Sequence, residues 1–359
     1  MKRILILEPY YGGSHKHFLE GLQENVIADY KLFTLPARKW KMRMQLSAPW
    51  FVGQIKTLPV DERHFDTVLC STFVDVAVLR SLLSGVDGWN PDAKVLTYFH
   101  ENQFVYPQRF DQPIQHQFSS INFHSALVSD GIAFNSVYNR DSFLAGCGKQ
   151  LKAAADMKFP GIVEELSHKS IILYPGIEFS GIDKIEWKTS TNIPVIVWNH
   201  RWEHDKNPEH FFLALELLEQ RGVDFRLIVL GQSFNNSPEC FAQSEEKFKD
   251  KILHYGFVAS YQEYIKLLSQ GDIVVSTSLH EFYGISIIEA VRAGCYPLLP
   301  SRLSYPELFE EKFLYGEDSL SERLKVLIEK QCRLSHETAR AMTNKFSWES
   351  MQNFYSEWL

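Results

Sequence analysis

Two carboxylates, Glu281 and Glu289, stand eight residues apart around a loop suited to binding a phosphorylated sugar. The buried strand predicted over Asp272–Thr277 ends before Glu281, and the helix predicted over Gly284–Ala293 contains Glu289. A helix N-terminus presents unpaired N–H groups to an anion. One carboxylate can then accept hydrogen bonds from a sugar, and the other from a ribose. The alternative is a loop acid followed by an acid on a helix surface.

Two cations, Arg201 and Lys206, follow the strand predicted over Pro194–Asn199, and Pro208 is well placed to start the next helix. A nucleotide diphosphate gains negative charge as it leaves a sugar. A guanidinium fork and an ammonium stabilise that charge without a metal ion. The sequence has no Asp-x-Asp pattern, so we expect metal-free chemistry without a cofactor. Solvated loop cations are the alternative.

Further candidates follow predicted strands in the first half of the chain. Gly12 and Gly13 come after the strand predicted over Arg3–Leu7, and glycines there let backbone amides approach a phosphate or a sugar. His100 follows the strand predicted over Lys94–Phe99, where a histidine can hydrogen-bond a sugar hydroxyl or pass a proton. A turn without a ligand and a structural histidine are the alternatives.

A basic stretch surrounds Trp40 and contains Arg38, Lys39, Lys41 and Arg43. Cations meet phosphates, and an indole can stack on an unpaired base, so we expect RNA contact here. The alternative is a solvated loop whose Trp40 tucks into the fold. A net charge of −7 argues against a broad surface that coats nucleic acid, but it leaves room for a local patch.

The bulk composition indicates an ordinary globular protein, with 45% apolar and 23% charged residues, and the length of 359 residues favours two domains. Five cysteines without a Cys-x-x-Cys pair indicate the reducing cytosol. His15 and His17 would not share a helix face, so a metal site is not expected. The apolar run Ile4–Leu7 is too short for a signal peptide, and no run is long enough for a bilayer. We therefore expect a cytoplasmic protein without membrane contact.

Apolar runs alternate with amphipathic stretches along the whole chain. Strands are predicted at Arg3–Leu7, Lys31–Leu35, Thr67–Ser71, Lys94–Phe99, Gly131–Asn135, Ser170–Tyr174, Pro194–Asn199, Phe225–Leu230, Ile252–Tyr255, Asp272–Thr277 and Tyr296–Leu299. Helices are predicted most clearly at Gln112–Asp130, Pro208–Gln220, Tyr261–Leu268, Gly284–Ala293 and Ser319–Lys330. This alternation predicts an α/β protein in which two doubly wound, Rossmann-like domains face a cleft.

The polar stretch Ser180–Ile193 has no clear period and is the predicted linker. We therefore expect an N-terminal domain over residues 1–180 and a C-terminal domain over residues 193–340. The aromatic, amphipathic stretch from Ser347 to Trp358 predicts a helix within a final segment of residues 341–359. That helix either stays with the second domain or returns to the first.

The paired glutamates and the Arg-x4-Lys spacing resemble the retaining family 4 glycosyltransferases, which have the GT-B fold. The resemblance implies that Glu281 contacts the donor sugar and Glu289 the ribose, while Arg201 and Lys206 bind the diphosphate. It places a histidine such as His100 beside the sugar. It further implies that the N-terminal domain binds the acceptor, the C-terminal domain binds the nucleotide-sugar, and the last helix crosses back to the first domain. Donor contacts are expected at Gly12, Gly13, Val258, Tyr283, Gly284, Ile285 and Glu289.

Four segments, Leu7–His15, Pro36–Arg43, Phe99–Gln103 and Asn199–Pro208, resemble more narrowly the tRNA-queuosine mannosyltransferase group. This resemblance implies GDP-mannose as donor and, as acceptor, the cyclopentene diol of queuosine at a tRNA wobble position, giving an α-mannoside. Catalytic roles are expected for Arg201, Lys206, Glu281 and His100, and acceptor contacts for His15, Arg38, Lys39, Trp40 and Arg43. The alternatives are a family 4 enzyme with another donor acting on a glycan or lipid, a nucleotide-sugar epimerase, and a non-catalytic tRNA-binding protein.

Overall fold

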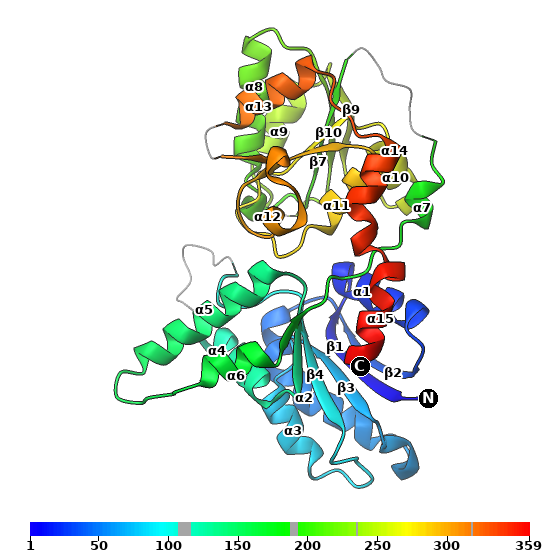
Figure 1. The fold of residues 1–359 in the computed structure, drawn as a ribbon, viewed down its shortest axis with the longest axis vertical. Coiled ribbons are helices and arrows are strands. Elements are labelled where there is room, and N and C mark those ends of the chain that lie inside the picture. Colours follow the sequence, from blue (N-terminus) through cyan, green and yellow to red (C-terminus); the bar gives the residue numbers. More distant parts are fainter. Residues whose placement is uncertain (107–115, 187–192, 235, 317–318) are drawn as a thin grey trace. The chain divides into compact units, whose positions relative to one another are not determined.

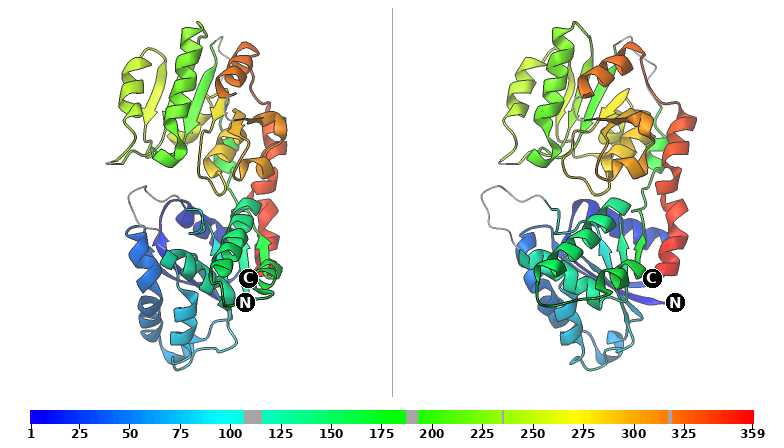
Figure 2. Two further views of the ribbon diagram at one scale, coloured as in Figure 1. Left: turned by 90° about the vertical axis from the view of Figure 1, so that its left-hand side faces the viewer. Right: turned by 60° about the vertical axis from the view of Figure 1, so that its left-hand side comes forward.

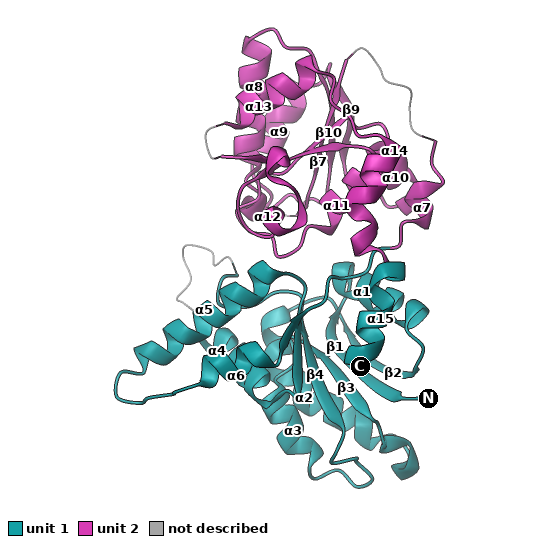
Figure 3. Cartoon of the chain, viewed as in Figure 1, with its two compact units in different colours: residues 1–177, 348–359 teal, residues 178–347 magenta. Residues whose placement is uncertain are grey.

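The structure, a computed structural model, describes residues 1–359 apart from 107–115, 187–192, 235 and 317–318 (Figure 1). The chain divides into two compact units (Figure 3). Unit 1 comprises Met1–Ile177 and Trp348–Leu359, and unit 2 comprises Glu178–Ser347. The predicted linker over Ser180–Ile193 begins as a short helix of unit 2, α7 (Ser180–Asp183), and its residues 187–192 lie outside the described part of the chain.

The sheet of unit 1 has six parallel strands in the order β2-β1-β3-β4-β5-β6. Its strands are β1 (Arg3–Tyr11), β2 (Asp29–Pro36), β3 (Thr67–Ser71), β4 (Lys94–Phe99), β5 (Gly131–Phe134) and β6 (Ser170–Ile172). Its helices are α1 (Gly13–Asn25), α2 (Trp40–Lys56), the 3₁₀ helix η1 (Val60–Arg63), α3 (Val76–Leu83), α4 (His116–Val128), α5 (Val137–Ala153), α6 (Ile162–His168) and α15 (Trp348–Trp358). The predicted helix over Gln112–Asp130 starts, within the described residues, at His116.

Helices cover both faces of this sheet (Figure 2). Successive side chains of β1 point to opposite faces, and both sets are apolar, so both faces need cover. Ile4 and Ile6 belong to a core with α1 and α15, whereas Leu5 and Leu7 pack with α2 and α3. A strand buried on both faces reads as a continuous apolar run, which is why the sequence predicted it.

The sheet of unit 2 is also six-stranded and parallel, in the order β12-β11-β10-β7-β8-β9. Its strands are β7 (Val195–Asn199), β8 (Arg226–Leu230), β9 (Ile252–Gly256), β10 (Ile273–Val275), β11 (Tyr296–Pro300) and β12 (Leu314–Tyr315). After α7, its helices are η2 (His204–Lys206), α8 (Pro208–Gln220), α9 (Cys240–Lys247), α10 (Tyr261–Leu268), α11 (Ile285–Arg292), α12 (Tyr305–Leu308), η3 (Glu311–Phe313), α13 (Leu320–Glu329), α14 (His336–Thr343) and η4 (Asn344–Phe346). The core between α8, α9, α13 and one sheet face includes Trp198 and Phe211. Strand β12 was not predicted, since two residues carry no period.

The last helix returns to unit 1, as the GT-B resemblance implied, and α15 lies beside α1 (Figure 1). Trp348 is buried there against two glycines of unit 1. A Cβ atom on Gly21 would lie 2.1 Å from the indole nitrogen of Trp348, and one on Gly176 would lie 2.3 Å from its ring. The hydroxyl of Tyr355 lies 3.2 Å from that of Tyr98 on β4. The returning helix is therefore part of the core of unit 1.

Within unit 2, Arg292 at the end of α11 ties together two distant chain segments. Its guanidinium donates to both carboxylate oxygens of Asp183, at 2.7 Å each, and to the side-chain oxygens of Thr343 at 3.1 Å and Asn344 at 2.6 Å. Arg292 is buried, and the ring of Phe179 lies 4.6 Å from its guanidinium carbon. A buried arginine needs such bidentate pairing to offset its lost hydration.

All five cysteines are free thiols. Across the described ranges, no helix has both the length and the apolar character needed to cross a bilayer.

Candidate functional site

Lys206 and Glu281, which are far apart in the sequence, are in contact in unit 2. Lys206 ends η2, and Asn207 adopts a left-handed conformation (φ 50°) before Pro208 starts α8. The ammonium of Lys206 donates to the carbonyl of His280 at 2.6 Å and to Oε2 of Glu281 at 3.3 Å. The Arg-x4-Lys segment and the first glutamate of the pair thus share one site.

The carboxyl group of Glu281 is held in its ionised form. Burial favours the neutral acid, but the charge of Lys206, its hydrogen bond and the neighbouring His200 and His280 together outweigh burial and lower the pKa of Glu281 to about 2. A second carboxylate, that of Asp205, lies 3.4 Å from the ammonium of Lys206. A carboxylate only accepts hydrogen bonds, which suits Glu281 to the hydroxyl groups of a sugar.

The loop between the two glutamates starts a helix. Gly284 is the N-cap of α11 with φ 104°, a left-handed conformation that favours glycine, and Ile285 is the first helical residue. The backbone N–H of Tyr283 points to Oε1 of Glu281 at 3.4 Å, and its carbonyl accepts a hydrogen bond from Ser304 at 2.9 Å. The three predicted donor contacts, Tyr283, Gly284 and Ile285, therefore lie at the N-terminus of α11 beside Glu281.

Glu289 lies on α11 and is bound by two tyrosines of α10. Its carboxylate accepts hydrogen bonds from Tyr264 at 2.8 Å and Tyr261 at 3.2 Å. Burial raises the pKa of Glu289, against the effect of these two hydrogen bonds. Asn199, at the end of β7, donates to the hydroxyl of Tyr264 at 2.8 Å and to the carbonyl of Ser286 at 3.0 Å. Asn199 and Tyr264 were missed by sequence reasoning, and only the spacing of two tyrosines on one helix could have indicated them.

Arg201 is exposed and its side chain pairs with Glu203 at 3.1 Å. It follows His200, which is buried and whose pKa is lowered to about 3, first by burial and then by the charge of Lys206. The charges of Glu281 and Arg201 also act on this ring. The charges of Arg201, Lys206 and Glu281 thus all act on one neutral histidine.

The four residues expected to converge are connected at the carboxyl end of β7, where ligands bind in open parallel sheets. Lys206 contacts Glu281 directly, and Arg201 follows the end of the same strand, next to His200 in the chain. Glu289 is linked to this strand end through Tyr264. Val258, an expected donor contact, lies half-buried in the segment between β9 and α10. Its neighbour Phe257 is 64% exposed.

In unit 1, His15 is buried between two carboxylates. Its Nδ1 lies 3.0 Å from Oε2 of Glu8, and its Nε2 lies 3.3 Å from Oε2 of Glu101. Burial opposes a charge on His15, but the two carboxylates outweigh it and raise the pKa of His15 to about 10. Both glutamates lie within the segments Leu7–His15 and Phe99–Gln103 named above, but no role was predicted for them.

The ring of His100 lies 4.1 Å from that of His15, centroid to centroid. Burial, and then the charge of His15, lower the pKa of His100 well below its usual value. Two neighbouring histidines therefore have opposite protonation states. His100 follows β4, as predicted, and is 8% exposed.

The remaining residues expected in unit 1 lie around the starts of α1 and α2. Gly12 is the N-cap of α1 and Gly13 its first residue. Arg38 and Lys39 are exposed, and Lys39 adopts a left-handed conformation (φ 53°) at the N-cap of α2.

Trp40 is the first residue of α2 and packs against aromatic rings of unit 1. Its ring centroid lies 5.1 Å from that of Phe118 and 6.2 Å from that of Phe73, so the side chain is partly buried. Arg43, one turn further along α2, is also partly buried. This arrangement corresponds to the alternative in which Trp40 tucks into the fold, although the basic residues before it reach solvent.

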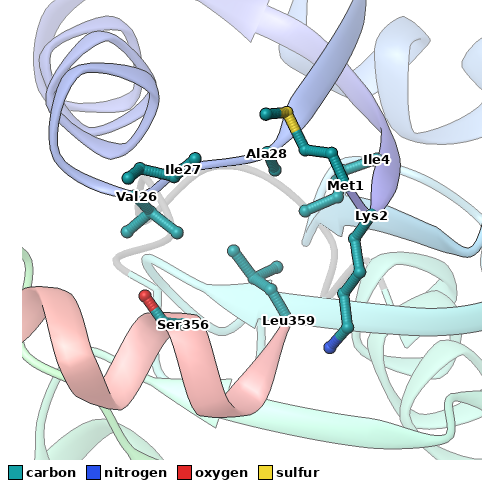
Figure 4. A pocket seen from close by; sticks show the side chains of 8 residues that line it. All are labelled: Met1, Lys2, Ile4, Val26, Ile27, Ala28, Ser356 and Leu359. Carbon is teal, nitrogen blue, oxygen red and sulfur yellow. The ribbon is translucent and has the colours of Figure 1, made fainter.

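The structure also shows whether a metal site and a further cavity are present among the described residues. Among the residues that the structure describes, no three His, Cys, Asp or Glu side chains are grouped so as to hold a metal ion. A mostly apolar hollow of about 410 Å³ lies between the two chain ends, lined by Met1, Lys2, Ile4, Val26, Ile27, Ala28, Ser356 and Leu359 (Figure 4). None of the predicted site residues lines it.

Two family models match the chain. Residues 3–177 match the N-terminal model described as tRNA-queuosine alpha-mannosyltransferase, and residues 182–345 match the model described as glycosyl transferases group 1. The two matches correspond closely to the two structural units.

Individual proteins are also similar to this chain. The tRNA-queuosine alpha-mannosyltransferase of Drosophila melanogaster is 35% identical over 334 residues, covering 89% of this chain and 85% of the relative. The GDP-mannose:cellobiosyl-diphosphopolyprenol alpha-mannosyltransferase of Xanthomonas oryzae is 30% identical over 101 residues, covering 28% of this chain and 26% of the relative. The crystal structure of Anabaena HepE in complex with UDP superposes with a TM-score of 0.69 at 14% identity, covering 99% of each chain. This similarity over almost the whole of both chains confirms the predicted fold.

Proposed function

Since the chain belongs to the tRNA-queuosine alpha-mannosyltransferase family, we propose that it transfers mannose from GDP-mannose to queuosine in tRNA. The similarity to the fly enzyme across most of both chains supports the acceptor and the sugar. The second mannosyltransferase supports GDP-mannose as the donor, since its name specifies that donor. The expected setting is the cytoplasm.

The observation that carries the proposal is the contact between Lys206 and Glu281 at the end of β7. In the proposed reaction, the bond between the anomeric carbon and the phosphate oxygen breaks. The acceptor oxygen bonds to the same face of the sugar, and its proton passes to the departing GDP. Lys206 and Arg201 stabilise the negative charge of GDP. The ammonium of Lys206 has three N–H groups, so a phosphate oxygen can replace one of its present acceptors while the contact with Glu281 is kept.

Glu281 and Glu289 have different tasks in this proposal. Glu281 is ionised beside Lys206 and accepts hydrogen bonds from mannose hydroxyls, which fixes the sugar over the leaving group. Glu289 holds the ribose of GDP and is itself oriented by Tyr264. The first turn of α11 offers backbone N–H groups to the diphosphate.

We propose that the transfer needs no metal ion and no cofactor. Arg201 and Lys206 supply the positive charge that a divalent cation supplies in metal-dependent transferases. Turnover by protein treated with EDTA and passed through a desalting column should equal that of untreated protein. A loss of turnover that is restored only by Mg²⁺ or Mn²⁺ would contradict this part of the proposal.

Labelled GDP-mannose with matched tRNA pairs tests the function directly. We expect label to enter tRNA that carries queuosine and not the same tRNA carrying guanosine. Label entering a lipid or glycan instead would favour the other family 4 activity. An altered sugar nucleotide formed without any acceptor would indicate an epimerase. Binding of tRNA without binding or turnover of nucleotide-sugar would indicate a non-catalytic RNA-binding protein.

The exposed Arg38 and Lys39 before α2, with the partly buried Arg43 on it, are the proposed tRNA contact. Charge reversal in the double variant Lys39→Glu/Arg43→Glu should weaken tRNA binding by about tenfold or more at low salt, because phosphate contacts are lost. Affinity for GDP should stay unchanged, since that site is in unit 2. The matched control is Lys56→Glu in the last turn of the same helix. Unchanged tRNA affinity in the double variant would refute the assignment.

A further inference from the structure

The cluster around His15 has more negative than positive charge. Both ring nitrogens of His15 face carboxylate oxygens, at 3.0 Å for Glu8 and 3.3 Å for Glu101, so both nitrogens carry a hydrogen and the ring is a cation. One imidazolium between two carboxylates leaves one negative charge uncompensated. All three side chains are buried, where an unbalanced charge is unfavourable unless further partners satisfy it.

The two carboxylates differ in what they can still accept. Glu8 is sealed, with a side chain 2% exposed, and its Oε1 already accepts from the N–H of Tyr10 at 2.7 Å and from the hydroxyl of Ser71 at 3.2 Å. The side chain of Glu101 is 12% exposed. Its Oε1 accepts only the hydroxyl of Thr72, at 2.7 Å, among the described residues. A carboxylate has about four acceptor positions, so the free capacity of the cluster is at Glu101.

A second observation also indicates a ligand here. His100 is more than nine-tenths buried and its ring lies against that of His15, yet no described residue hydrogen-bonds its ring nitrogens. Buried polar groups are nearly always paired in a protein or by a ligand. Glu101 and His100 follow β4 at the carboxyl end of the sheet, which is the ligand-binding end of open parallel sheets.

A group of aromatic rings adjoins the cluster; Phe73 is buried, and Tyr10 and Trp40 are partly exposed. The ring of Phe73 lies 5.5 Å from that of His15, 5.2 Å from that of Tyr10 and 6.2 Å from that of Trp40. The partly exposed rings of Tyr10 and Trp40 can stack with a flat nucleobase taken out of its stack. An anionic group beside an aromatic surface suits a ligand that joins a cation to a flat ring.

We propose that Glu101 binds the protonated secondary amine that joins the cyclopentene diol of queuosine to its deazaguanine ring. This inference rests on the proposed function and adds the group that distinguishes the acceptor. A charge-assisted hydrogen bond from the ammonium to Glu101 supplies the missing positive charge of the cluster. The surplus negative charge thereby becomes a determinant of specificity, because a neutral substituent on the same ring cannot supply the positive charge that balances it.

The test uses two tRNA competitors that differ in one charge. One carries 7-aminomethyl-7-deazaguanine at the wobble position, which is cationic, and the other carries 7-cyano-7-deazaguanine, which is neutral. Neither has the diol, so neither accepts mannose. Against queuosine-bearing tRNA, we expect the aminomethyl competitor to inhibit the unaltered protein about tenfold more strongly than the cyano competitor, the effect of one charge-assisted contact. Glu101→Gln should abolish this ratio.

The matched control is Glu24→Gln, an exposed glutamate on α1, which should keep the ratio. A purely structural role for Glu101 would change the melting temperature and weaken both competitors equally, so the ratio separates recognition from folding. Equal inhibition of the unaltered protein by both competitors would overturn the proposal, and this comparison needs no variant to fold. A ratio that survives Glu101→Gln would overturn it as well. Failure to mannosylate queuosine-bearing tRNA at all would instead overturn the proposed function.

Discussion

The two units contain charge clusters built alike and suited to opposite ligands. In unit 2 the cation is Lys206, between Asp205 and Glu281, beside the neutral His200. In unit 1 the cation is His15, likewise between two carboxylates and beside a neutral histidine. The ammonium of Lys206 has three N–H groups, and the exposed Arg201 of the same segment adds a second cation, so this cluster can offer positive charge to an anion. Both N–H groups of the imidazolium are fixed by carboxylates, so the other cluster stays anionic. The identity of the central base thus decides which charge a site offers.

The largest effect is expected from removing the central base of unit 2. Lys206→Ala should lower turnover by about 10³-fold, because the leaving diphosphate loses its buried cation. Single-turnover measurement with labelled GDP-mannose provides the test. Lys249→Ala is the matched control, since Lys249 is exposed and its partner among the described residues is Glu246. Near-normal turnover by Lys206→Ala would end the assignment of unit 2 as the donor site.

The corresponding loss in unit 1 should be one of stability. Glu8→Ala removes the acceptor of three buried donors, the N–H of Tyr10, the hydroxyl of Ser71 and Nδ1 of His15, and should lower the free energy of unfolding by about 3 kcal/mol. Urea unfolding, with hydrogen exchange read separately for peptides of each unit, measures this. Glu281→Ala, whose side chain is 20% exposed, should instead reduce activity more than stability. A Glu8 variant as stable as the unaltered protein would show that the cluster does not hold unit 1 together.

The clusters should also fail at opposite ends of the pH scale. The pKa of His15 is raised to about 10, so its contribution to stability is complete below the unfolded value of 6.5 and is lost as pH rises through about 10. The pKa of Glu281 is lowered to about 2, so its contribution is complete above the unfolded value of 4.5 and is lost as pH falls toward 2. Hydrogen exchange should show unit 1 loosening first in alkali and unit 2 first in acid. The reverse order would contradict both assignments.

The smallest effect should come from the partner of the second glutamate. Tyr264→Phe removes the hydroxyl shared by Glu289 and Asn199 and should weaken GDP binding about fivefold, the effect of one hydrogen bond of about 1 kcal/mol. Calorimetric titration with GDP measures this, and tRNA affinity is the internal control. An unchanged GDP affinity would separate Glu289 from ribose binding.

Elements buried in long apolar runs could be predicted from the sequence. The bounds of β3, β4, α8 and α10 match their predictions, because burial on both sheet faces or on one helix stripe leaves a strong local pattern. Strand β1 runs to Tyr11 rather than ending at Leu7, since the carboxylate of Glu8 interrupts the apolar run. Glu8 is nevertheless buried, because its contact with the charged His15 offsets part of the free energy lost when the carboxylate leaves water.

The donor residues were predicted because a family spacing marks them, whereas the acidic cluster of unit 1 was not. Glu101 meets His15 across 86 positions of sequence, and no local period connects a strand-end acid with a histidine on another helix. Tyr264 was missed for the same reason, because its role depends on the distant Asn199 and Glu289. Pairings between elements follow from the topology of the sheet, which a single sequence specifies only indirectly.

Arg292 links the helix of the proposed donor site to the two places where the chain enters and leaves unit 2. It lies three residues after Glu289 on α11 and is bonded to Asp183, shortly after the chain enters unit 2, and to Asn344, shortly before the chain leaves. Both chain segments that connect the two units are therefore hydrogen-bonded, through this one side chain, to the helix that carries Glu289.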